Sequence, residues 1–92
     1  DFYFAGFLSN KAASRQNQLK KLSQLNTTIV FYESCHRITA CLEDILAVFG
    51  DKDICVAREI TKKFEEIKRQ KTSQIIAHFK QNKPRGEFVV IL

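Results

Sequence analysis

The chain has 92 residues, of which 45% are hydrophobic, 27% charged and 11% aromatic, with three glycines and one proline. This composition is typical of one folded domain, and it excludes a disordered segment, a collagen and a disulfide scaffold. Fifteen Lys and Arg against ten Asp and Glu give a net charge of +5, which favours polyanionic partners.

The three cysteines are Cys35, Cys41 and Cys55, and their spacings match no zinc or redox motif. We therefore expect free thiols in a reducing, cytoplasmic compartment and no metal site. No stretch approaches the ~20 apolar residues of a membrane span, so no membrane association is expected. The chain contains no Met and begins with Asp1, so we expect it to be part of a longer protein.

The first half of the chain predicts two strand–helix units. An aromatic-rich apolar run predicts a buried strand at residues 2–8. An apolar stripe, with Asn10 as the cap, predicts a helix at residues 10–25. The β-branched and aromatic run at 27–32 is typical of a strand covered on both faces. Apolar residues at helical spacing then predict a helix over residues 38–49, ended by Gly50.

The second half predicts a hairpin, a helix and a last strand. Residues 54–57 form a short apolar run, and 64–69 alternate weakly, so together they indicate a hairpin. Thr72 is expected to cap a short helix that carries Ile75, Ile76 and Phe79. Residues 81–86 have the composition of a loop, and 87–92 predict the final strand.

The resulting order, β-α-β-α-β-β-α-β, predicts a single α/β domain with a mixed, mostly parallel sheet flanked by helices. Ligands of such sheets bind beyond the carboxyl ends of the strands. Those ends carry residues 8–11, 33–37 and 58–62, which are unusually polar. A binding site is therefore expected at this edge of the sheet.

Residues 33–37 combine a carboxylate, a hydroxyl, an imidazole and a guanidinium at the start of a predicted helix. A helix start can bind a carboxylate or phosphate, and Arg37 can contact a phosphate through two N–H groups. Alternatively, Ser34 only caps the helix, and Glu33 and Arg37 form a surface ion pair worth under about 1 kcal/mol. The residues alone leave both interpretations open, and residues 58–62 can likewise be a site or a solvated hairpin.

Taken together, several motifs resemble those of a known family. They are Gly6-Phe7-Leu8 with Lys11 and Arg15, FYESCHR at 31–37, AREITKKFEE at 57–66 and GEFVVIL at 86–92. The pattern resembles the C-terminal domain of ribosomal RNA small subunit methyltransferase I, in the tetrapyrrole methylase superfamily.

The resemblance implies transfer of a methyl group from S-adenosylmethionine to the ribose 2′-hydroxyl of a cytidine in small-subunit (16S) ribosomal RNA. It further implies that residues 1–92 are the C-terminal subdomain of a two-domain cytoplasmic enzyme, often a homodimer. The cofactor would lie in the cleft between the two domains. Because the N-terminal cofactor-loop domain is absent from this chain, the fragment alone is expected to be inactive.

Carried over by position, the resemblance implies two sets of contacts. The residues expected at the cofactor are Phe31, Tyr32, Glu33, Ser34, Glu59 and Thr61. Those expected at the RNA are Lys11, Arg15, His36, Arg37, Arg58 and Lys62. Glu33 and His36 are candidates for a catalytic base, although methyl transfer can depend chiefly on alignment, so no base is assigned.

The sequence departs from the family pattern where Cys35 and Ser9 replace the usual prolines and Gln70 replaces a common glycine. Each lost proline frees a φ angle and adds a backbone N–H, so looser loops are expected. Two other functions stay open: a stand-alone basic RNA-binding or adaptor module, and a fragment of a methylase acting on a small-molecule tetrapyrrole.

Overall fold

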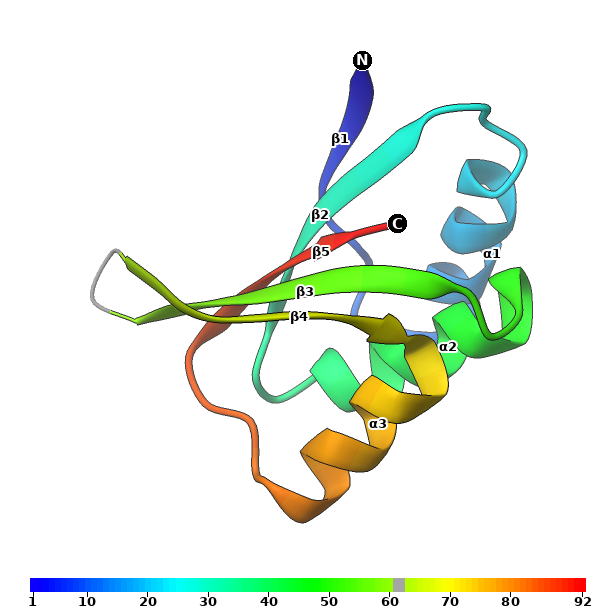
Figure 1. Ribbon diagram of the computed structural model, residues 1–92. Coiled ribbons are helices and arrows are strands. Elements are labelled where there is room, and N and C mark those ends of the chain that lie inside the picture. Colours follow the sequence, from blue (N-terminus) through cyan, green and yellow to red (C-terminus); the bar gives the residue numbers. More distant parts are fainter. Residues whose placement is uncertain (61–62) are drawn as a thin grey trace.

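The computed structural model describes the backbone of residues 1–60 and 63–92, and the side chains of residues 1–58 and 68–92 (Figure 1). The described elements follow the predicted order: β1 (Phe2–Phe7), α1 (Ala12–Leu22), β2 (Thr28–Ser34), α2 (Ile38–Phe49), β3 (Asp53–Ile60), β4 (Lys63–Lys71), α3 (Thr72–Gln81) and β5 (Glu87–Ile91). The single α/β domain predicted from the sequence is confirmed.

The strands of the described residues form one mixed sheet in the order β1-β2-β5-β3-β4. β1 and β2 are parallel, whereas β2–β5, β5–β3 and β3–β4 are antiparallel. The predicted mixed sheet is confirmed, but the prediction that it is mostly parallel was wrong. The β3–β4 hairpin reverses the chain direction once, and α3 then leads to β5 lying parallel to β4. β5 therefore runs opposite to both of its neighbours.

This topology still gathers the three predicted strand ends at one edge. β2 and β3 are each antiparallel to β5, so they point in the same direction, and β1 points with them. The carboxyl ends of β1, β2 and β3 therefore meet at the same edge of the sheet, although β5 lies between β2 and β3.

All three helices cover one face of the sheet (Figure 1). The core lies between these two layers and contains fully buried side chains of every helix and of the central strands, including Leu19, Ile38, Leu42, Ile45, Ile75, Phe31, Phe88 and Val90. Burying a side chain of this size stabilises a fold by about 1.5–3 kcal/mol. The described helices include none that is long and apolar enough to cross a membrane.

The opposite face of the sheet is open, and aromatic residues gather on it. Phe4, Phe7 and Tyr32 are 47%, 60% and 42% exposed. The Tyr32 ring contacts both phenylalanines, with ring centroids 5.2 Å from Phe4 and 5.4 Å from Phe7. The predictions of a buried first strand and of a second strand covered on both faces were therefore wrong, because the helices pack on one face only and β1 is an edge strand.

A bulge in β1 explains how Phe4 and Phe7, three positions apart, share one face. Phe4 pairs with Val30 and Gly6 with Phe31, so Ala5 is an extra residue in the register. Gly6 has φ +67°, in the left-handed region that favours glycine. The inserted residue shifts the side-chain alternation by one position.

The helix starts differ in detail from the predictions. α1 begins after Lys11 instead of Asn10, with no side-chain cap. Thr72 is the first residue of α3, and its hydroxyl donates to the Lys52 carbonyl at 2.9 Å. The backbone N–H of the next residue, Ser73, donates a hydrogen bond to Asp51 Oδ1 in the preceding turn at 2.8 Å. The cap of α3 is thus supplied from a distance.

Candidate functional site

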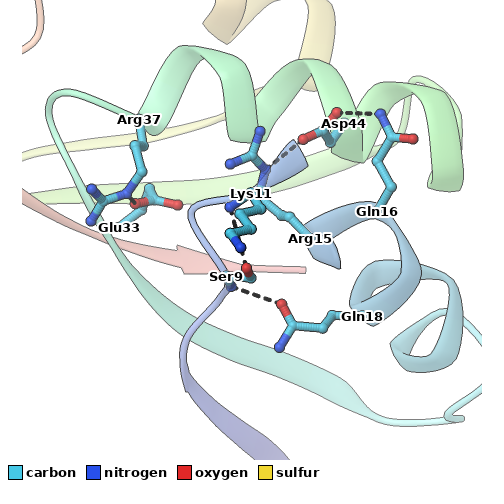
Figure 2. Close-up of polar contacts among 8 residues, drawn as sticks. All are labelled: Ser9, Lys11, Arg15, Gln16, Gln18, Glu33, Arg37 and Asp44. Atoms are coloured by element: carbon cyan, nitrogen blue, oxygen red, sulfur yellow. Dashed lines mark hydrogen bonds and ion pairs between the residues drawn. The ribbon is translucent and has the colours of Figure 1, made fainter. Parts of the chain in front are cut away.

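Glu33 is the organising group at the carboxyl end of β2. Its side chain is 2% exposed, and its Oε1 accepts a hydrogen bond from Ser34 N at 2.9 Å. The same oxygen accepts a second bond from Arg37 Nε at 3.2 Å, which Figure 2 shows. Burial first, then the Glu33 charge, raise the pKa of Cys41 above its ordinary value. Two donors therefore hold the carboxylate, while the Arg37 side chain stays 39% exposed. The carboxylate fixes a guanidinium at the edge of the sheet.

Arg58 lies in the same row of the sheet as Glu33. Phe88 of β5 pairs with Glu33 on one side and with Arg58 on the other. Residues opposite one another in a sheet share a face, and neighbouring strands lie about 4.8 Å apart, so the two backbones are separated by roughly 10 Å. The second and third strand ends thus present their motif residues side by side, as expected from the sequence.

A groove opens between the start of α2 and the loop that enters β5. Its volume is about 550 Å³, and it is lined by Cys35, His36, Thr39, Lys83, Pro84, Arg85 and Gly86. A smaller hollow of about 220 Å³ shares Lys83 and Pro84 with it and is also lined by Arg58, His78, Phe79 and Asn82. Together they place the cations Arg58, Lys83 and Arg85 around a largely apolar groove at the helix side of the edge.

Arg15 has a different place from the other motif residues. It is only 4% exposed, and its Nε donates to Asp44 Oδ2 at 2.5 Å. Gln16 donates to the second oxygen of the same carboxylate at 2.7 Å (Figure 2). The guanidinium therefore joins α1 to α2 inside the protein.

On the open-face side of the edge, Tyr32 and Ser34 occupy alternate positions of β2. Tyr32 is exposed beside Phe7, whereas the Ser34 hydroxyl oxygen is buried and has no hydrogen-bond partner among the described residues. The interpretation of Ser34 as a helix cap is not supported, because α2 begins after Arg37 without a side-chain cap.

The remaining predicted residues fall into three places. Phe31 is fully buried in the core, on the helix side of β2. Lys11 and His36 are exposed at the ends of β1 and β2. Thr61 and Lys62, and the side chain of Glu59, lie outside the described residues. Among the side chains that are described, no group of His, Cys, Asp and Glu could hold a metal ion.

Both N–H groups that replace the usual prolines are hydrogen-bonded. Ser9 N donates to Gln18 Oε1 at 2.8 Å, as Figure 2 shows, and Cys35 N donates to the Gly86 carbonyl at 3.1 Å. The looser loops expected from the sequence are therefore offset by two added hydrogen bonds. The second of these bonds joins two residues that line the groove.

Sequence reasoning missed the second wall of the groove, Lys83, Pro84, Arg85 and Gly86. These residues were recognised only as a loop. The usable signal was two cations flanking a proline directly before a buried strand. A loop that enters an antiparallel strand lies at the same edge as the carboxyl ends of its neighbours.

The fold and the site define a small α/β domain that offers one polar, cationic sheet edge for a ligand. No protein-family model matches the chain. Curated relatives do match: proteins named ribosomal RNA small subunit methyltransferase I are 44% identical in Thermotoga maritima, 41% in Synechocystis and 36% in Bacillus subtilis. Each alignment covers 99% of this chain and 40%, 33% and 31% of the respective relative.

The resemblance inferred from the motifs is thereby confirmed. The chain is homologous to part of ribosomal RNA small subunit methyltransferase I, and it spans about a third of the length of the curated relatives.

Proposed function

We propose that residues 1–92 are the C-terminal subdomain of a two-domain, S-adenosylmethionine-dependent methyltransferase that 2′-O-methylates a cytidine ribose in small-subunit ribosomal RNA. The observation that carries this proposal is the similarity over 99% of the chain to proteins named ribosomal RNA small subunit methyltransferase I. The edge where β1, β2 and β3 end supports it, because this edge combines exposed cations with a fixed carboxylate–guanidinium pair.

The open-face side of the edge fits the proposed cofactor. Tyr32 offers an exposed ring to a planar base. Ser34, on the same face, stays a proposed contact by its motif position, and its hydroxyl oxygen is buried. Phe31 and Glu33 face the helices and are sealed from solvent. Their proposed role is to support the strand end, whereas Glu59 and Thr61 stay proposed contacts from the β3 end. When bound, the cofactor supplies the methyl group.

The helix side of the edge fits the RNA. Glu33 holds Arg37 in place, and Arg58 and Lys11 present further cations at the same edge. We include Lys62 in this set by its motif position and leave out Arg15, whose guanidinium is buried against Asp44. Cations fixed in this way would align the ribose by its flanking phosphates, and alignment is a large part of catalysis in a transfer reaction.

Transfer to the 2′-oxygen also requires the hydroxyl proton to leave. Of the two candidates for a base, Glu33 is 2% exposed and already accepts two hydrogen bonds. His36 is exposed at the rim of the groove. His36 is therefore the candidate that could reach a substrate hydroxyl, and Glu33 is a positioning residue.

The proposal also names protein partners. A group of exposed aromatic side chains of this kind is unusual on a monomer and indicates a protein contact. We propose that the rest of the same protein and a second copy of it complete the cytoplasmic enzyme, and that this chain alone does not transfer methyl groups.

The test uses the complete natural protein with small ribosomal subunits that lack the modification and a methyl-labelled cofactor. We expect label in the ribosomal RNA at one cytidine, with the adjoining phosphodiester resistant to alkali, because a 2′-O-methyl group blocks that cleavage. Label in an alkali-sensitive nucleotide would contradict ribose methylation. Salt-sensitive RNA binding without any transfer would favour the binding-module alternative, and methylation of a tetrapyrrole instead of RNA would favour the third.

A further inference from the structure

The groove beside α2 has two walls that come from distant parts of the chain. Cys35, His36 and Thr39 form one wall, and residues 83–86 form the other. The bond from Cys35 N to the Gly86 carbonyl joins the walls at 3.1 Å. A volume of about 550 Å³ is within the range of small-ligand sites, roughly 300–1,000 Å³, so the groove can admit a nucleotide-sized group.

The charge of this groove selects the class of ligand. His36, Lys83 and Arg85 are exposed in its lining, and no described acidic residue lines it. An imidazole carries at least one N–H donor in every tautomer, and Lys and Arg only donate. The first turn of α2 adds free backbone N–H groups and the positive end of the helix dipole.

Such a lining disfavours a sulfonium cofactor, which is itself a cation, and favours an anion. The neighbouring hollow extends the same chemistry, since it shares Lys83 and adds Arg58 and His78. Three cations, Lys83, Arg85 and Arg58, along two adjoining hollows match a chain of phosphates better than one isolated phosphate.

We propose that this groove binds the phosphodiester backbone of the RNA substrate, with Lys83 and Arg85 as phosphate contacts and His36 on the opposite wall. The inference deepens the proposed function, on which it rests, by adding a second wall to the RNA surface. Lys83 and Arg85 then add two phosphate contacts to those of the motif residues that the sequence singled out.

The test compares two variants of the complete natural protein with equal changes in charge. Lys83→Gln/Arg85→Gln alters the groove. Lys20→Gln/Lys21→Gln alters two exposed residues in the last turn of α1, at the opposite end of the molecule (Figure 1). Affinity for a short, fluorescein-labelled single-stranded RNA is measured by anisotropy over a range of KCl concentrations. Circular dichroism checks that both variants are folded.

On single-stranded RNA, each phosphate that a protein cation neutralises adds about 0.7 to the salt slope. The groove variant removes two such cations, so its slope is expected to fall by about 1.4, or about 25-fold in affinity per decade of salt below 1 M. The control pair should keep the wild-type slope. An unchanged slope in the groove variant, or an equal fall in the control, overturns the proposal. Loss of cofactor binding with RNA binding intact overturns it too, since the groove would then serve the cofactor.

Failure of the proposed function gives a different result. If the wild-type protein transfers no methyl group but binds RNA with a slope that depends on Lys83 and Arg85, the groove assignment stands and the methyltransferase assignment falls. If methyl transfer occurs and the groove variant binds RNA as the wild type does, only the groove assignment is overturned.

Discussion

The buried pair of Arg15 and Asp44 gives a quantitative test of the structure against the sequence motif. The motif placed Arg15 at the RNA, whereas the structure places its guanidinium between α1 and α2. Removing one member of a buried pair leaves the other charge uncompensated and costs about 3–5 kcal/mol. Because Gln16 still donates to Asp44 in an Arg15→Met variant, we expect the lower end, about 3 kcal/mol.

The assay is urea unfolding followed by circular dichroism. At an m value of about 1.5 kcal/mol per M, a loss of 3 kcal/mol lowers the midpoint by about 2 M. The double variant Arg15→Met/Asp44→Leu replaces both charges with apolar groups and should recover to within about 1 kcal/mol of the wild type. Lys20→Met, on the exposed side of the same helix, is the control and should change stability by at most about 0.5 kcal/mol.

RNA binding by the double variant completes the test. A buried guanidinium releases no counterions, so the salt slope should equal that of the wild type. A loss below about 1 kcal/mol for Arg15→Met, or a slope lowered by about 0.7 in the double variant, would refute the assignment of Arg15 to the protein interior.

Three further results are expected. Glu33→Gln removes the charge that fixes Arg37, so RNA affinity of the complete protein should fall about 5- to 20-fold, by about 1–2 kcal/mol, in anisotropy titrations, and an unchanged affinity would contradict the positioning role. The hydrogen bonds from Ser73 lower the pKa of Asp51, so the stability that Asp51 contributes is present above the ordinary pKa and is lost as the pH falls through the lowered pKa. In Asp51→Asn, the urea midpoint should therefore fall less steeply as the pH is lowered from 7. An unaltered pH dependence of the midpoint would contradict the role of Asp51 as a cap. Because burial and Glu33 raise the pKa of Cys41, it should react last with a thiol reagent in the native protein and rapidly in urea; early labelling of Cys41, located by peptide mapping, would be inconsistent with the site geometry.

The sequence predicted the elements well because each carries a local signal. The apolar positions of residues 38–49 repeat at helical spacing, and α2 has these bounds. The polar strand ends were also visible, and the equal direction of β1, β2 and β3 placed them at one edge. The elements, and the edge at which β1, β2 and β3 end, could therefore be predicted from local residue patterns and from the order of the elements in the chain.

The errors have a common physical cause, which is contact between residues far apart in the chain. The place of β5 between β2 and β3 decides whether the sheet is mostly parallel, and no local pattern of residues 87–92 reports it. An arginine on a helix looks alike whether it meets solvent or an aspartate on another helix, so Arg15 was assigned to the surface. The continuous apolar run of β2 likewise does not reveal which face the helices leave open.

The bulge at Gly6 determines which side chains of β1 lie on the open face of the sheet. A residue with a side chain resists φ +67°, and a regular strand would place Phe4 and Phe7 on opposite faces. In that case only one of the two rings could contact Tyr32, whereas in this structure both do. One backbone torsion at a position without a side chain thus determines how much aromatic surface the domain offers to a neighbour, although Gly6 itself would contribute almost nothing to that interface.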